Sequence, residues 1–233
     1  MKKAAIFMAA VALSLPAVSY LWAESAQKAA PSEKVNLGGF VKEIMCMQLE
    51  ASHIDMAMWI PLEFYVASAL NDGKTTREAA EKELAFLKPY LTVFVMSGVD
   101  QPDGTQHYAA EDEVRKRAVI RLDDGTEIRP LQTVPPKMVG VIATMKASMG
   151  SSAEKMHCFV YPNQGKDGKP IIDGSQRGKL TMAILGATRA DDVIFTWRTP
   201  FDAVVKAPPC SKCGETVSAK WLFCPWCGQK LAS

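Results

Sequence analysis

The stretch CSKCGETVSAKWLFCPWCG, residues 210–228, decides how the C-terminal end of this 233-residue chain folds. It contains two C-x-x-C pairs separated by ten residues, formed by Cys210, Cys213, Cys224 and Cys227. Two tight turns with this spacing can present four thiolates to one tetrahedral metal ion, with zinc–sulfur distances of about 2.3 Å. Gly214 and Gly228 follow the pairs, where the backbone must turn sharply and glycine adopts a positive φ at no steric cost.

The segment around these cysteines is too short to fold on apolar contacts alone. Its large apolar side chains are Trp221, Leu222, Phe223, Trp226 and Leu231. A bound metal must therefore supply much of the folding free energy, about 10 kcal/mol or more. Residues 208–231 resemble the zinc-ribbon family found at the ends of many bacterial proteins, which implies one structural Zn²⁺ held by all four cysteines. Lys212, Lys220 and Lys230 are expected to offset the negative charge of the four thiolates.

Four cysteines in two pairs also have other chemical uses. Covalent haem attachment needs a histidine after the second cysteine of a pair, and glycine stands at both positions. A catalytic zinc keeps an open coordination position, whereas four thiolates close the coordination sphere. Two disulfides or two redox-active pairs remain the alternative, because exported proteins normally oxidise their thiols. A tightly bound zinc would resolve this conflict, since coordinated thiolates are poor partners for oxidation.

The N-terminal residues have the pattern of a signal peptide. Lys2 and Lys3 precede an uncharged, mostly apolar run over residues 4–22, which ends in small residues that offer cleavage points. We interpret residues 1–23 as a signal peptide and residues 24–36 as a flexible spacer. An apolar run of this length can also span a bilayer, so a retained anchor is the alternative. Both interpretations predict export to the periplasm or cell envelope.

Charge and composition exclude some classes of function for the rest of the chain. Hydrophobic residues make up 48% of the sequence and charged residues 22%, which is typical of a folded domain. Without Lys2 and Lys3, the 27 basic side chains become 25 and balance the 25 acidic ones. A neutral chain lacks the basic field of a nucleic-acid-binding protein, so nucleic acid is not an expected partner. Membrane contact is expected only through a retained N-terminal anchor.

Residues 37–205 are expected to form an α+β domain with an antiparallel sheet and two to four helices. Apolar spacing and capping signals predict helices over residues 44–58, 61–70, 75–88 and 137–149. β-Branched and aromatic runs predict strands over residues 90–99, 114–122, 126–131, 156–161, 179–185 and 193–197. Asp124-Gly125 is a hairpin turn signal between two of these strands. Residues 163–178 are expected to be a polar loop, and residues 206–209 a short stiff linker.

Candidate chemical groups in the α+β domain are sparse. Cys46 and Cys158 lie in apolar stretches and are interpreted as buried thiols, with a disulfide between them as the alternative. His53 lies among Met45, Met47, Met56 and Met58, where soft-metal binding competes with simple core packing. The sequence has no Gly-rich phosphate loop, no G-x-S-x-G and no H-E-x-x-H motif. We therefore assign no catalytic and no organic cofactor-binding residues.

The sequence favours a non-enzymatic binding or scaffold protein of the cell envelope, with a structural zinc and a protein partner. Aromatic residues such as Trp226 are expected on the surface of the ribbon. The alternative is an enzyme whose active site lies in the α+β domain; a pocket that holds His53, His157 and a carboxylate such as Asp55 or Glu63 would support it. The whole chain resembles exported bacterial proteins of unknown activity that end in a zinc ribbon, which implies no activity.

Overall fold

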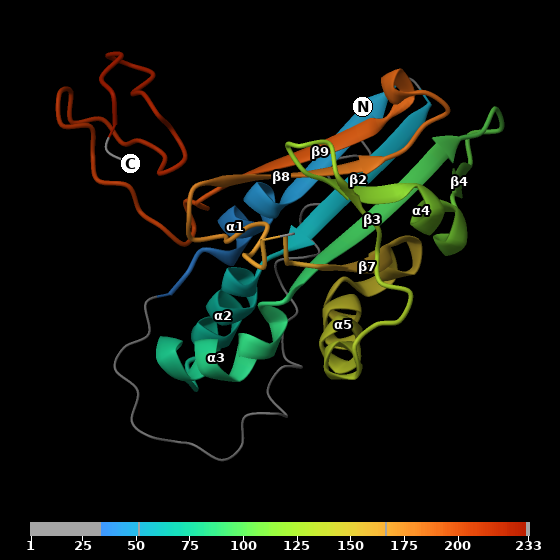
Figure 1. Cartoon of the computed structure of the whole chain (residues 1–233), viewed down its shortest axis with the longest axis horizontal. Coiled ribbons are helices and arrows are strands. Elements are labelled where there is room, and N and C mark those ends of the chain that lie inside the picture. The colour runs from blue at the N-terminus through green and yellow to red at the C-terminus, as the bar shows by residue number, and fades with distance from the viewer. Residues whose placement is uncertain (1–33, 51, 166, 232–233) are drawn as a thin grey trace.

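A computed structural model describes residues 34–50, 52–165 and 167–231, and the expected signal peptide lies outside them. The described residues form two antiparallel sheets and five α-helices, followed by the cysteine-rich segment (Figure 1). The α+β class is therefore confirmed, although the helices outnumber the expected two to four. Within the same residues, no helix combines the length and apolarity needed to cross a bilayer.

The first sheet has five strands: β1 (Met45–Glu50), β2 (His53–Ile60), β3 (Tyr90–Asp100), β4 (Gln106–Tyr108) and β7 (His157–Pro162). Strands β1, β2 and β3 are neighbours in that order, and β4 and β7 pair with opposite ends of β3 along its other edge. The central strand β3 is buried along most of its 11 residues. This burial explains its continuous β-branched and aromatic sequence.

The second sheet has four strands in the order β6-β5-β8-β9: β5 (Ala118–Arg121), β6 (Glu127–Ile128), β8 (Gly178–Ile184) and β9 (Val193–Thr199). The predicted Asp124-Gly125 hairpin is confirmed, since Gly125 has a φ of 81° and its N–H donates to the carbonyl of Leu122 at 3.0 Å. The second predicted hairpin is confirmed as well, because β8 and β9 pair along their full lengths.

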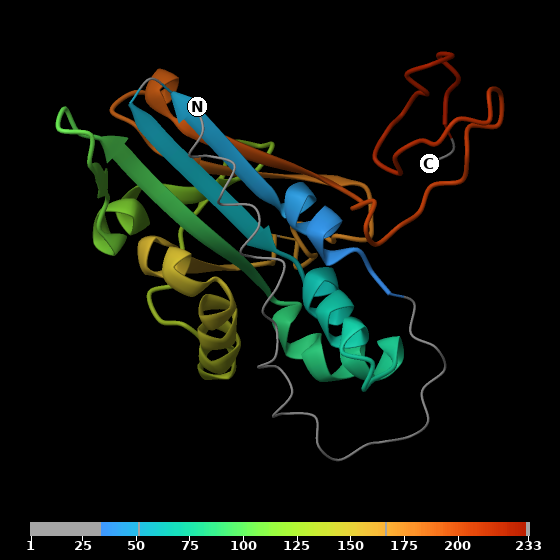
Figure 2. The same ribbon diagram turned by 180° about the vertical axis from the view of Figure 1, so that it is seen from behind.

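The α-helices are α1 (Leu37–Ile44), α2 (Leu62–Asn71), α3 (Arg77–Glu83), α4 (Glu111–Arg117) and α5 (Pro136–Ser148). Short 3-10 turns cover Leu84–Leu87, Gly150–Lys155 and Arg189–Asp191. The N-cap of α3 is Thr76, whose hydroxyl accepts the N–H of Ala79 at 3.3 Å, rather than the predicted Thr75. Helices α2, α3 and α5 lie on the side of the first sheet that faces away from β8 and β9 (Figures 1 and 2).

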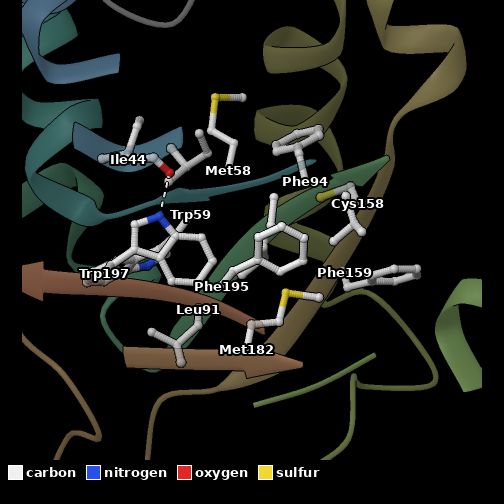
Figure 3. Packing of buried hydrophobic residues seen from close by; sticks show 14 of the residues in the cluster. Ile44, Met58, Trp59, Leu91, Phe94, Cys158, Phe159, Met182, Phe195 and Trp197 are labelled. Carbon is white, nitrogen blue, oxygen red and sulfur yellow. Dashed lines mark hydrogen bonds between the residues drawn. The ribbon is translucent and has the colours of Figure 1, made fainter. Parts of the chain in front are cut away.

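The largest core covers both faces of the first sheet, and its part between the two sheets is rich in aromatic side chains (Figure 3). The rings of Trp59 and Trp197 meet edge to face with centroids 6.2 Å apart. The indole N–H of Trp197 donates to the carbonyl of Ile44 at 2.7 Å, which satisfies a polar group that is otherwise buried. Along the same edge, the Cys46 thiol donates to the carbonyl of Thr196 at 3.6 Å and helps to join β1 to β9.

Residues 44–58 were expected to be helical, and this prediction is wrong. They form the antiparallel hairpin of β1 and β2, in which Met45 pairs with Met58 and Met47 with Met56. The four methionines thus share one face of a sheet, since alternate residues of a strand point the same way. The predicted strand over residues 114–122 is half right, because its first part belongs to α4 and only Ala118–Arg121 is a strand.

Candidate metal centre

Two nearly identical turns carry the four cysteines. In the first turn, the N–H of Gly214 donates to the carbonyl of Cys210 at 2.8 Å, and the N–H of Cys210 donates to the carbonyl of Glu215 at 2.9 Å. The same two bonds recur in the second turn: the N–H of Gly228 donates to the carbonyl of Cys224 at 2.9 Å, and the N–H of Cys224 donates to the carbonyl of Gln229 at 2.8 Å. The C-x-x-C-G sequence therefore folds in the same way twice, which brings both pairs of thiols to the same point.

The glycines of these turns are needed for their backbone conformation. Gly214 has a φ of 74° and Gly228 a φ of 71°. A Cβ atom at either position would meet no other atom within 4 Å, so space is not the constraint. L-Residues with a side chain rarely adopt such a φ, whereas glycine adopts it freely.

The four sulfur atoms form a compact cluster that could hold a metal ion. All of them lie within 4.8 Å of one another. Cys210 and Cys227 have a sulfur–sulfur distance of 3.6 Å, as have Cys213 and Cys224. A tetrahedral site with zinc–sulfur bonds of about 2.3 Å has edges of about 3.8 Å, whereas a disulfide bond measures about 2.05 Å. The cluster therefore matches a closed tetrahedral sphere of four free thiols.

Backbone amides stabilise the thiolate form, which a metal requires, in part of this cluster. The N–H groups of Cys213 and Lys212 lower the pKa of the Cys210 thiol to about 6. The N–H of Glu215 favours the thiolate of Cys213, but desolvation and hydrogen bonds with the other three sulfurs raise the pKa of that thiol to about 12. Once one thiol of the crowded cluster is ionised, its neighbours keep their protons more strongly. A divalent cation that bound the sulfur atoms would displace these protons.

The ribbon buries very little apolar surface of its own. Its buried residues are Cys210, Val217 and Cys224, so two of the three are metal-ligand candidates. The larger apolar side chains lie on the surface instead, with exposed fractions of 37% for Trp221, 55% for Leu222 and 57% for both Phe223 and Trp226. Such a unit has no hydrophobic core to hold its shape, and this supports a metal as its main source of stability.

Polar contacts attach the ribbon to the α+β domain. The Nζ of Lys220 lies 2.7 Å from Oε2 of Glu43 in α1. The carboxylate of Asp202 accepts the hydroxyl of Ser218 at 2.8 Å and the N–H of Ala219 at 2.9 Å. Lys220 was expected to offset the charge of the thiolates, and this expectation is wrong, because its partners are carboxylates of the main domain.

The remaining cysteines lie too far apart for the alternative disulfide. Cys46 is on β1 and Cys158 on β7, with β2 and β3 between them, which amounts to three strand spacings or about 14 Å. A disulfide needs Cα atoms within about 7 Å of each other. The pairing register also aligns Cys46 with His157, so Cys158 points to the opposite face of the sheet. Both are free thiols.

The enzyme alternative requires a pocket that holds His53, His157 and a carboxylate, and these residues do not form one. His53 pairs with Val99 at one end of β3, whereas His157 pairs with Val95 on the other edge of that strand. The Nε2 atom of His157 lies 2.8 Å from the carbonyl oxygen of Ala109. Glu63 lines a cavity, but neither histidine does. The two methionines of β2 near His53, Met56 and Met58, are buried in the core.

Comparison with known proteins finds no matching family model, no matching curated protein and no matching solved structure. The zinc-ribbon resemblance is therefore supported in part, by the geometry of the four-cysteine cluster.

Proposed function

We propose that this chain is an exported, non-enzymatic binding or scaffold protein of the cell envelope, and that its zinc-bound ribbon docks onto a partner protein. The single observation that carries the docking role is the surface formed by Trp221, Leu222, Phe223 and Trp226, here called the ribbon surface. Four large apolar residues within six positions are all exposed. Isolated apolar residues on a surface need no explanation, whereas a contiguous group of this kind marks an interaction site.

The composition of the ribbon surface favours a protein partner. The rings of Trp221 and Trp226 meet at 61° with centroids 5.7 Å apart, so the two indoles support each other without being covered. Tryptophan is enriched among the residues that contribute most to protein–protein binding, because a rigid ring buries much area at little entropic cost. Four thiolates around Zn²⁺ would fix the backbone beneath these rings.

The position of the ribbon fits a docking module. It projects from one end of the molecule, beyond α1, and its tip lies away from both sheets (Figure 2). The polar contacts to the main domain involve residues 218–221, whereas Leu222, Phe223 and Trp226 remain more than half exposed. The export assignment is supported by the sequence pattern of residues 1–23, and a closed zinc sphere would protect the cysteines in an oxidising compartment.

The docking role is tested by recovery of partners from a cell-envelope fraction. Tagged full-length protein is compared with a chain lacking residues 208–233 and with the double variant Phe223→Ser/Trp226→Ser. Val139→Ser is the matched control, because Val139 is a similarly exposed apolar residue on α5. We expect the same partner to be recovered by the wild type and the control and to be lost in both ribbon variants. Recovery of identical proteins by all four chains would show that the ribbon has no docking role.

A further inference from the structure

Strand β1 lies at one edge of the first sheet (Figure 2). Among the described residues it pairs with β2 alone, so its outer edge has no neighbouring strand. Three large apolar residues are exposed in the described part of the α+β domain, and two of them lie on β1. These two are Met47, which is 41% exposed, and Leu49, which is 60% exposed. The strand therefore combines an open edge with apolar side chains in contact with water.

The backbone groups of β1 point alternately towards β2 and towards this open edge. The N–H of Asp100 donates to the carbonyl of Ser52 at 2.7 Å, so Ser52 faces β3 and the next residue, His53, faces β1. The last residue of β1 is the pairing partner of His53, and this fixes the alternation along β1. The N–H and C=O groups of Met47 and Leu49 therefore point to the open edge, where the described residues offer them no backbone partner.

The other edge strands of the two sheets are short or carry partners. Side chains of β1 donate to the carbonyls of Ile194 and Thr196 on β9. The N–H of Leu131 donates to the carbonyl of Val160 on β7 at 2.7 Å, and β4 and β6 have only three and two residues. Open edge strands pair readily with other chains, and natural proteins commonly protect them with lysine or proline. Strand β1 has six residues and contains neither.

The free donors of β1 are arranged symmetrically about one residue. The N–H of Met45 already donates to the carbonyl of Val41 at the end of α1. The outward N–H groups that remain belong to Met47 and Leu49, which flank Gln48. A two-fold axis at Gln48 would pair Met47 of one copy with Leu49 of a second, antiparallel copy. Both N–H groups of each copy would then gain a carbonyl acceptor on the other copy.

The side chains of β1 fit the same arrangement. Cys46 and Gln48 point towards β9, so Met47 and Leu49 lie on the opposite face of the sheet. Around the two-fold axis, Met47 would lie beside the Leu49 of the other copy, and each would cover apolar surface that is now exposed to water. Glu50 is the only charged residue of β1, and it would lie opposite the uncharged Cys46 of the other copy. No like charges would meet.

We propose that two copies of this chain pair through their β1 strands, antiparallel about Gln48, and thereby join their first sheets into one continuous sheet. A second copy is favoured over a foreign strand because the free donors, the apolar side chains and the charges of β1 all match themselves. The pairing covers few residues, so the dimer is reversible, with a Kd of about 10–100 µM. This interface does not involve the ribbon surface, so the dimer and the docking function can fail independently.

The dimer is tested by sedimentation velocity of the mature zinc-loaded protein from about 1 to about 500 µM, where we expect a shift from monomer to dimer. Met47→Pro removes an N–H that points to the open edge and spares the bonds to β2, a position where a strand tolerates proline. Leu49→Lys places a charge in the two-fold contact and does not depend on that tolerance. Each variant should raise the dimer Kd at least about tenfold. Val139→Lys is the matched control, since Val139 is 55% exposed on α5, and it should leave the Kd unchanged.

The register is tested by cross-linking of Gln48→Cys. On the two-fold axis the two copies of this residue form a pair without backbone bonds, in which Cα atoms lie about 4.5 Å apart and a disulfide can form. Mild oxidation should therefore give covalent dimers of Gln48→Cys. Gln101→Cys, at an exposed position just after β3 and with the same native thiols, should give none.

The ribbon variant Phe223→Ser/Trp226→Ser should dimerise like the wild type, which separates this interface from the ribbon surface. A wild-type monomer at every concentration would overturn the proposal and leave a strand of another protein as the occupant of this edge. An unchanged Kd in both β1 variants, or loss of the dimer in the ribbon variant, would also overturn it.

Discussion

The Nζ of Lys220 lies 2.7 Å from Oε2 of Glu43, so a lysine of the ribbon is bound to a carboxylate of helix α1 that is 177 positions away in sequence. Only 23% of the lysine side chain and 17% of the glutamate side chain are exposed. Glu43 also accepts the N–H groups of Asp202 and Ala203, at 2.9 and 3.0 Å. One carboxylate therefore joins the ribbon, α1 and the segment after β9.

Loss of the lysine should loosen the ribbon. In Lys220→Met, Glu43 keeps its two backbone donors but loses its cation, at a cost of about 1 kcal/mol in the attachment of the ribbon. We expect residues 206–209 to be cleaved several times faster in limited proteolysis. Lys212→Met is the control, since Lys212 is an exposed lysine of the same ribbon. Equal cleavage of the two variants would show that the Lys220–Glu43 contact does not hold the ribbon.

Zinc content should depend on the four clustered cysteines. We expect one zinc per wild-type chain by metal analysis, loss of the metal in Cys224→Ser, and no change in Cys46→Ser. Chelation should expose residues 208–231 to protease and leave the α+β domain folded, because the buried cluster around Cys210 and Cys224 is separate from the main core. Zinc retained by Cys224→Ser, or wild-type protein isolated without metal and with disulfides between these cysteines, would contradict the structural-zinc assignment.

The parts of the fold that follow from local patterns were predictable. The turn at Asp124-Gly125 and the helix that begins at Pro136 depend on neighbours in sequence, and both are found. The hairpin of β1 and β2 was missed, although Met45 and Met47, and Met56 and Met58, alternate with period two, which is the signature of a strand. Helix α4 was also missed; acidic residues in its first turn and basic residues in its last complement the helix dipole and could have indicated it.

Contacts between segments that are distant in sequence were not predictable. Local spacing is sufficient to bring the four cysteines together, because each pair lies within one turn. Nothing in the sequence links Lys220 to Glu43, since this pair joins distant segments whose approach is decided by sheet topology. The Cys46–Cys158 alternative fails for the same reason, since only the strand order reveals that two strands lie between them.

Gly214 and Gly228, the glycines of the two cysteine turns, should be sensitive to substitution because of their φ values. Gly214→Ala and Gly228→Ala place a side chain at φ values of 74° and 71°, which costs about 1 kcal/mol or more each and should weaken zinc binding at least several-fold. Gly140→Ala is the matched control, because its added Cβ also meets nothing within 4 Å but lies in helix α5. We expect this control to stabilise the protein by about 0.5–1 kcal/mol. Zinc competition and thermal unfolding measure both effects, and equal effects at the three positions would refute the argument from φ.

The Cys158 thiol should make the α+β domain less stable at alkaline pH. Burial raises the pKa of this thiol from 9.0 to about 12. Since the folded-state pKa lies above the unfolded one, the stabilising effect is complete below about pH 9 and is lost as pH rises from 9 towards 12. In that window the group lowers the free energy of unfolding by up to about 1.4 kcal/mol per pH unit.

Cys158→Ala isolates this effect. Burial also raises the pKa values of Tyr65 and Tyr161, but both tyrosines remain in the variant, so their contributions cancel when the two proteins are compared. Denaturant unfolding at pH 8, 9 and 10 should therefore show a stability difference that shrinks as pH rises, because only the wild type must keep this thiol protonated to stay folded. A difference that stays constant over these three pH values would mean that Cys158 can ionise in the folded protein. The Cys158 side chain would then be less completely buried than the structure shows.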